Sequence, residues 1–269
     1  AFDTVDHELL LMRTSHHFGI SGNVLKWFRS YLTLRSQVVV LSDSSSEQRY
    51  IECGVPQGFV LGPILFTMYI SPLGDIARRV GLSYHLYADD TQLYVAFEPG
   101  TTDQVCCQQI QDCLVAMQEW MNSNFLKLNN DKTDVILIGS RHQHSRFEME
   151  HITLNGHDLS LSESVCDLGV ILDNRLNMND HITSVCKSAN YHLRNIAKIR
   201  RYLSESDAVK VIHALVSSRI DYCNAVLAGL PNSSISRLQR VQNNAARVLA
   251  RVRKYDHITP ILRQYHWLP

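Results

Sequence analysis

The spacing of hydrophobic and polar positions along the chain changes near residue 180. Before it, stretches with helical spacing alternate with short apolar runs that are typical of strands. After it, apolar residues recur only at helical spacing, in three predicted helices: residues 182–196, 208–216 and 231–252. The pattern predicts an α+β part over residues 1–180 and an all-helical part over residues 181–269.

Caps and turn residues set the expected order of elements in the first part. Four helices are expected: over 7–18 after the cap Asp6, after Ser21, from the Gly/Pro loop at 54–66 to about Arg79, and from Thr102 onward. Strands are expected at residues 37–41, 49–53, 135–139 and 166–173, and a hairpin is expected at Asn155-Gly156.

Two adjacent carboxylates interrupt the apolar and aromatic run LYADDTQLYV at residues 86–95. Both flanks are rich in strand-forming residues, so Asp89 and Asp90 are expected at or near a hairpin tip. Neighbouring carboxylates repel each other, and a divalent cation would remove that cost. A simple Asp-Asp β-turn is the alternative, and the dipeptide alone favours it.

Composition is that of an ordinary globular chain, with 45% hydrophobic and 19% charged residues among 269. No apolar run approaches the roughly 20 residues of a membrane span, and no targeting signal is visible. The seven cysteines lack zinc-site spacing and are interpreted as reduced thiols, which predicts an intracellular protein of the nucleus or cytoplasm. Because residue 1 is Ala, the chain is expected to be a fragment or a processed chain.

The zero net charge conceals an asymmetry between the two parts. Residues 1–180 hold 12 basic and 22 acidic side chains, whereas residues 181–269 hold 14 basic and 4 acidic ones. A basic segment of this kind suggests a polyanionic partner.

Four motifs follow one another in this order: GVPQGFVLGP, YADD, LNNDKTDVILIG and DLGVILDNRL. The set resembles the reverse transcriptases of LINE-type (non-long-terminal-repeat) retrotransposons, and the helical region ending in ITPILRQYHWLP resembles their thumb. The resemblance covers essentially the whole chain, and an unrelated α+β protein would need all four motifs to coincide. It implies a polymerase right-hand palm, an antiparallel sheet with helices, over residues 1–180, truncated at its N-terminus. A helical basic thumb-like region follows over residues 181–269.

The resemblance also implies an activity, a cofactor and partners. The family makes DNA from an RNA template by two-metal transfer of a nucleotide from a dNTP to a primer 3′-hydroxyl, with Mg²⁺ (or Mn²⁺). RNA template, DNA primer and dNTP are thus the expected partners, with no membrane. Asp89 would be the main metal ligand and Asp90 the weaker one.

Further residues receive roles from the same resemblance. Phe2 would be the steric gate against a ribose 2′-hydroxyl, and Lys132 would assist proton transfer or neutralise charge near the triphosphate. The nucleotide and template would also be contacted by Gly54, Pro56, Gln57, Gly58, Phe59, Tyr87 and Ala88, and the primer grip by Leu168 and Gly169. The alternatives are a core phenylalanine, a solvated turn lysine, a helix-entry loop at 54–58 and a plain strand at Leu168-Gly169.

Two departures from the family pattern support a second hypothesis, a catalytically dead remnant that binds RNA or DNA. The family usually has Ser where this chain has Phe59. Its first catalytic aspartate falls upstream of Ala1, and neither Asp3 nor Asp6 matches that position.

The last predicted helix carries a basic stripe for which two interpretations stay open. Arginines at helical spacing share one face, with Asn244 between them: Arg237, Arg240, Arg247 and Arg251. This stripe is expected to contact nucleic-acid backbone, and the alternative is a solvated basic face.

Overall fold

The computed structural model describes residues 2–56, 58–98, 100, 103–147, 151–154 and 156–267. The chain forms two compact units, one of residues 1–135 and 143–160 and the other of residues 136–142 and 161–269. Within the described ranges, no helix is long and apolar enough to cross a membrane.

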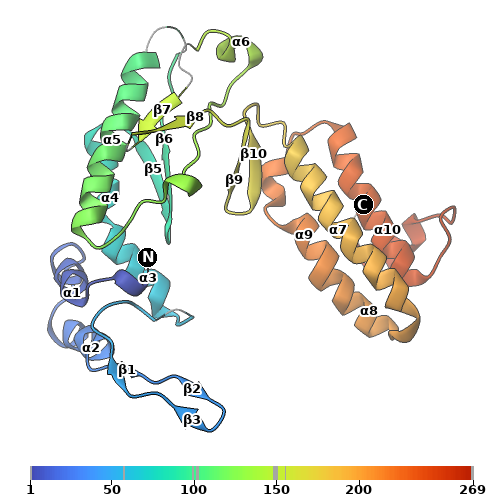
Figure 1. The fold of residues 1–269 in the computed structure, drawn as a ribbon. Coiled ribbons are helices and arrows are strands. Elements are labelled where there is room, and N and C mark those ends of the chain that lie inside the picture. Colours follow the sequence, from blue (N-terminus) through green and yellow to red (C-terminus); the bar gives the residue numbers. More distant parts are fainter. Residues whose placement is uncertain are drawn as a thin grey trace. The chain divides into compact units, whose positions relative to one another are not determined.

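The helical elements of the first unit are η1 (Phe2–Thr4), α1 (His7–His16), α2 (Gly22–Leu32), α3 (Leu61–Ile70), α4 (Pro72–Arg79), α5 (Asp103–Ser123) and η2 (Asn130–Lys132) (Figure 1). A capping residue explains where α1 begins and a proline explains where α4 begins, whereas Ser21 makes no side-chain cap bond to α2. The backbone N–H of Leu9 donates to the Asp6 carboxylate at 2.8 Å, which confirms Asp6 as the cap of α1. Pro72 separates α3 from α4 because a proline cannot continue the preceding hydrogen-bond ladder. The expected start at Thr102 lies outside the described residues.

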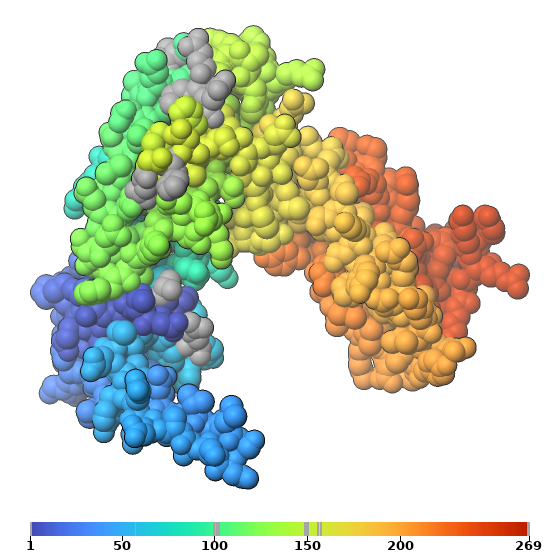
Figure 2. Space-filling model, viewed as in Figure 1, coloured from blue at the N-terminus to red at the C-terminus, as the bar shows by residue number. Residues whose placement is uncertain are grey.

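Strands of the first unit pair in antiparallel twos. β1 (Ser36–Gln37) pairs with β4 (Arg49–Tyr50), and β2 (Val40–Leu41) pairs with β3 (Ser44–Ser45). These two ladders make one hairpin that protrudes from the unit (Figure 2). β5 (Ser83–Tyr87) pairs with β6 (Asp90–Tyr94), and β7 (His151–Leu154) pairs with β8 (His157–Ser160). The predicted hairpin over 151–161 is thereby confirmed, although Asn155 itself lies outside the described residues.

The core of the first unit gathers residues of α1, α3, α4 and α5. Its largest fully buried side chains include Tyr69, Phe66, Leu10 and Leu65. Arg13 is also buried, and it donates to the Tyr69 carbonyl at 2.6 Å and to the Asn124 side chain. Its guanidinium lies 4.4 Å from the centre of the Tyr69 ring, so the buried charge is compensated by hydrogen bonds and an aromatic face.

The second unit begins with a hairpin and continues with helices. The hairpin joins β9 (Ser164–Asp167) to β10 (Val170–Asp173). The helical elements are α7 (Asn179–Ile199), η3 (Arg200–Tyr202), α8 (Glu205–Ile212), η4 (His213–Ser217), α9 (Ser218–Asp221), η5 (Asn224–Leu227), α10 (Asn232–Ala250) and α11 (Thr259–Gln264). One further short helix, α6 (Arg141–His144), spans the boundary between the units.

α7 and α10 lie side by side and run parallel (Figure 1). At their N-terminal ends, the Ser234 hydroxyl donates to the Asn179 side chain at 3.4 Å. At their C-terminal ends, Arg200 donates to the Leu249 carbonyl at 2.7 Å. Apolar residues of α7, α8 and α10 form the core between them: Ala189, Leu193, Ile196, Ala208, Ile212, Val241, Ala245 and Leu249.

Two strand predictions were wrong. Residues 135–139 do not form a strand, since they are only half-buried or exposed and cross the boundary between the units. Residues 166–173 are not one strand, because Leu168 (φ 44°) and Gly169 (φ 84°) turn the chain back on itself. The α+β class is confirmed. The described strands pair only two by two, so the palm arrangement stays a prediction.

Candidate functional site

Asp89 and Asp90 lie at the tip of the β5–β6 hairpin, as predicted. The last pair of the ladder is Tyr87 with Asp90, so Ala88 and Asp89 form a two-residue turn. Ala88 adopts φ 52°, a left-handed conformation that costs a residue with a Cβ about 1–2 kcal/mol. Both aspartates are exposed, and Tyr87 is 65% exposed. The turn therefore holds two carboxylates at the surface through a backbone conformation that strand pairing must stabilise.

The donor set at this tip suits a hard divalent cation. Mg²⁺ takes oxygen ligands, keeps several waters and is commonly bound by one or two carboxylates together with substrate phosphates. Asp89 and Asp90 supply carboxylate oxygens of this kind. Within the described residues, no group of three or more His, Cys, Asp or Glu side chains is arranged to hold a metal by itself. The carboxylates present thus fit a metal shared with a substrate better than a closed structural site.

Phe2 and Gly54 are brought together by pairing between the first residues and the loop before α3. The N–H of Val55 donates to the Phe2 carbonyl at 2.9 Å, and the N–H of Gly54 donates to the Val5 carbonyl at 2.7 Å. Gly54 has φ 91°, and a Cβ there would lie 3.0 Å from the Asp3 backbone. Only glycine allows this close approach, which explains the first glycine of GVPQG.

The Phe2 ring packs inside the first unit. It stacks on Phe66 with ring centroids 4.5 Å apart, and the residue is half-buried against the core. This contact gives the ring a structural role, as the core-phenylalanine alternative expected. Its partial exposure leaves the steric-gate role as a proposal.

The rest of the GVPQG segment is more open. Gly58 has φ 79° and open space around its Cα, so its backbone conformation rather than close packing requires glycine. Phe59 is 58% exposed, so its ring does not fill a gap in the core. A Cβ on Gly62 would lie 2.6 Å from the Pro56 carbonyl oxygen, so the loop packs closely on the start of α3. Gln57 lies outside the described residues.

Lys132 ends the short helix η2 (Asn130–Lys132) and is exposed. The Asn129 side chain accepts from the Asp131 N–H at 3.2 Å and caps this turn. Residues of the same motif line a groove of about 880 Å³ whose walls are both polar and apolar. Its lining residues are Gln118, Asn122, Lys127, Leu128, Asn129, Asn130, Asp131, Asp158 and Leu159.

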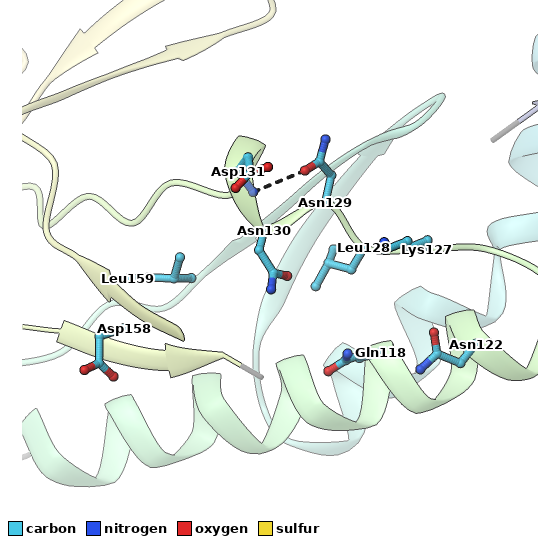
Figure 3. A pocket seen from close by; sticks show the side chains of 9 residues that line it. All are labelled: Gln118, Asn122, Lys127, Leu128, Asn129, Asn130, Asp131, Asp158 and Leu159. Carbon is cyan, nitrogen blue, oxygen red and sulfur yellow. Dashed lines mark hydrogen bonds between the residues drawn. The ribbon is translucent and has the colours of Figure 1, made fainter. Parts of the chain in front are cut away.

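The groove lies between α5, the 127–131 segment and β8. Gln118 and Asn122 project from α5, and Leu128, Asn130 and Leu159 point toward the space between the elements (Figure 3). Its lining residues do not include Asp89 or Asp90, so it is a feature separate from the hairpin tip. The sequence signal for it was weak, since scattered amide residues are also common in turns.

Leu168 and Gly169 form the turn between β9 and β10, both with positive φ. Two positive φ values in a two-residue turn match the twist of the flanking strands. Val170 and Leu172 pack against Met178 and Ile182 of the helical part, so the hairpin is anchored within the second unit.

The basic stripe divides into arginines with and without protein partners. Arg237 donates to the Thr183 hydroxyl at 2.7 Å, and Arg251 donates to the Arg200 carbonyl at 2.9 Å. Arg251 is not helical, because it ends α10 at φ 55°. Arg240 is exposed, whereas Arg247 is half-buried and its Nε has no hydrogen-bond partner in the described part of the chain.

A shallow hollow of about 410 Å³ lies where α7 and α10 end. It is lined by Ala197, Arg200, Arg201, Arg247, Val248, Arg251 and Val252. No carboxylate is among these lining residues, so the hollow is positively charged and suited to an anion. The sequence did not point to Arg200 and Arg201, because they come close to α10 only through the parallel packing of α7 and α10.

A family model and individual known proteins relate the chain to the same class of protein. The family model "Reverse transcriptase (RNA-dependent DNA polymerase)" matches residues 1–172. The chain is 26% identical over 258 residues to the RNA-directed DNA polymerase from mobile element jockey of Drosophila funebris, which covers 93% of this chain and 27% of that protein. It is 24% identical over 261 residues to a probable RNA-directed DNA polymerase from transposon X-element of Drosophila melanogaster, with the same coverage. The chain therefore spans about a quarter of the length of these relatives.

Proposed function

The chain belongs to the reverse transcriptase (RNA-dependent DNA polymerase) family, and on that premise we propose that it is the palm and thumb portion of a retrotransposon RNA-directed DNA polymerase. Residues 1–180 are the palm, and residues 181–269 are the thumb-like region. The observation that carries the proposal is the β5–β6 hairpin tip, where a turn with a left-handed Ala88 presents Asp89 and Asp90 at the surface.

Asp89 and Asp90 would hold the divalent metal, Mg²⁺ or Mn²⁺, with Asp89 as the main ligand and Asp90 as the weaker one. A metal bound there would supply positive charge to the attacking and leaving oxygens of nucleotidyl transfer. The exposure of both carboxylates at a hairpin tip is consistent with this task, because substrate phosphates must reach the same position.

The nucleotide and template lie against the segment that joins Phe2 to the GVPQG loop. Gly54, Pro56, Gln57, Gly58 and Phe59 form the surface under the base pair, and Tyr87 and Ala88 complete it from the hairpin. Phe2 restricts the sugar position through its exposed edge, while Phe66 fixes the ring from behind. Stacking on a second aromatic ring limits the rotamers of Phe2, as a steric gate requires.

Lys132 contacts the triphosphate, and residues of the second unit contact the primer and the nucleic-acid backbone. Lys132, exposed at the end of η2, neutralises charge on the triphosphate or transfers a proton. Leu168 and Gly169 contact the primer, and the arginines of α10 contact the nucleic-acid backbone. The partners are thus an RNA template, a DNA primer and dNTP, and we place the protein inside the cell, in the nucleus or cytoplasm.

A catalytically dead remnant that binds RNA or DNA is the second candidate. Phe59 favours it, because a ring that is 58% exposed stands where the family usually has the small residue Ser. A bulky exposed side chain at that position crowds the space assigned to the nucleotide. Primer extension by a longer product of the same reading frame, with Phe59 and with Phe59→Ser, distinguishes the two: activity with Phe59 present excludes the remnant.

The central test is Asp89→Asn in that longer protein. The change removes charge but keeps side-chain size, so primer extension should fall by about 10² to 10³ or more while the fold is kept. Asp43→Asn is the matched control, because Asp43 is an exposed aspartate in the turn between β2 and β3 of the same unit. Full activity of Asp89→Asn would overturn the assignment.

A further inference from the structure

Tyr222 contacts the turn of the β9–β10 hairpin from the helical part of the second unit. Its hydroxyl donates to the Leu168 carbonyl at 2.6 Å. Its ring lies beside Gly169, where a Cβ would be 3.4 Å from the ring. Tyr222 follows α9 directly and is followed by Cys223 at φ 52°, so a sharp bend of the chain presents the side chain to the hairpin.

The Leu168–Gly169 turn needs external support. Leu168 has φ 44°, a conformation that residues with a Cβ rarely adopt, and a two-stranded hairpin is marginally stable in isolation. Such a conformation persists only where surrounding contacts determine it. The bond from Tyr222 reaches the carbonyl of the strained residue itself, so it acts on the turn directly.

Other contacts hold strand β10 against the start of α7. The N–H of Ile171 donates to Nδ1 of His181 at 3.3 Å, and burial lowers the pKa of His181, which keeps this nitrogen an acceptor. The Asp173 carboxylate accepts from the N–H groups of Arg175, Asn177 and Met178 at 2.6–3.1 Å. With β10 fixed in this way, the bond from Tyr222 acts on the turn residue Leu168 itself.

We propose that Tyr222 is a positioning residue, which acts through the Leu168 carbonyl to hold the Leu168–Gly169 turn in the conformation that receives the primer 3′-end. This role rests on the proposed function of the turn as primer grip. Tyr222 itself does not touch the reacting atoms. It transmits the placement of α9 to the hairpin tip, so that the helical part and the tip move as one body within the second unit.

Tyr222 is 51% exposed, and this makes the contact testable without damage to the core. Tyr222→Phe removes one hydroxyl and keeps the ring against Gly169. A net hydrogen bond corresponds to about a two- to tenfold change in an equilibrium. Hydrogen exchange of residues 164–173 in the 269-residue chain should therefore rise by about two- to tenfold. Tyr255→Phe is the control, because Tyr255 is 90% exposed and lies in the same unit.

A binding measurement separates positioning from a purely structural role. Fluorescence anisotropy compares two probes of equal length, a primer–template with a recessed 3′-end and a blunt duplex. The wild-type chain and Tyr255→Phe should prefer the recessed end. Tyr222→Phe should lose that preference by about two- to tenfold and keep its affinity for the blunt duplex. Gly169→Ala, which strains the turn because an L-residue rarely adopts φ 84°, should give the same loss.

The outcomes distinguish this role from the proposed function. A Tyr222→Phe chain with faster exchange but an unchanged preference for the recessed end overturns the positioning role and leaves the proposed function standing. Equal loss of affinity for both probes overturns it as well, since it would indicate a general defect. A wild-type chain that binds neither probe contradicts the proposed function, and the role of Tyr222 falls with it.

Discussion

Replacing Arg240 and Arg247 together by Gln should weaken nucleic-acid binding in a salt-dependent way. These are the two arginines of the stripe for which the described part of the chain shows neither an ion pair nor a hydrogen bond that fixes the guanidinium. Arg237 and Arg251, in contrast, bind Thr183 and the Arg200 carbonyl. We therefore expect Arg240 and Arg247 to be the arginines most available to phosphates.

The magnitude follows from counterion release. Each duplex DNA phosphate that a protein neutralises contributes about 0.9 to the slope of log K against log salt, so the double variant should lose about 1.8. Relative to the 1 M reference, this corresponds to about 60-fold in affinity at 0.1 M salt. Between 50 and 200 mM salt, the ratio of wild-type to variant affinity should change about twelvefold.

The assay is fluorescence anisotropy of a labelled primer–template duplex, titrated with the 269-residue chain at several salt concentrations. The matched control is Arg219→Gln with Arg263→Gln, which removes the same charge from α9 and α11. The control should change the slope by much less than 1.8. An unchanged slope in the Arg240/Arg247 variant, or an equal change in the control, would refute the reasoning, because the effect would then be absent or due to net charge alone.

Three further predictions concern activity, reactivity and stability. Residues 1–269 alone should show no primer extension on a gel, because we expect neither Asp3 nor Asp6 to serve as the family's first catalytic aspartate; robust extension would show that Asp3 serves. Burial raises the pKa of the Cys113 thiol to about 11, so iodoacetamide at pH 8 should leave it unmodified by mass spectrometry until the chain is unfolded. Asp173→Ala should lower the free energy of unfolding by about 2–3 kcal/mol in urea titration, because three backbone N–H groups lose a charged acceptor. Asp221→Ala, at an exposed position of α9, is the comparison, and equal losses would contradict the argument. In the iodoacetamide experiment on Cys113, the exposed thiols of Cys53, Cys166 and Cys223 should instead react rapidly.

Caps and turns were predictable from the sequence, because residues close together along the chain determine them. Asp6 was identifiable as a cap because a side-chain oxygen three residues before a free N–H acts within one turn. The hairpin at Asp89 was predictable because strand-forming residues flank two residues that favour turns. In each case the deciding contact lies within a few positions along the chain.

The β9–β10 turn could not be predicted in the same way. A leucine and a glycine between two apolar stretches are compatible with one continuous strand, and Leu168 has no intrinsic preference for a positive φ. Tyr222, which binds its carbonyl, lies 54 positions further along the chain. The strand prediction for residues 135–139 was wrong for a related reason, because an apolar run is buried only when other elements cover it.

The arginine stripe shows why charge spacing does not by itself identify a binding surface. α7 and α10 are parallel, so their C-terminal carbonyls, which carry partial negative charge, lie together. Arg200 donates to the carbonyls of Leu249 and Leu203, and Arg251 donates to that of Arg200, so two guanidinium groups compensate these helix ends. In the sequence, Arg240 and Arg251 both fall on the helical spacing of the stripe, so their roles cannot be told apart there. The parallel packing assigns the first to stabilising the helix ends and leaves the second free to meet a phosphate, which is why the salt-slope experiment targets Arg240 and Arg247.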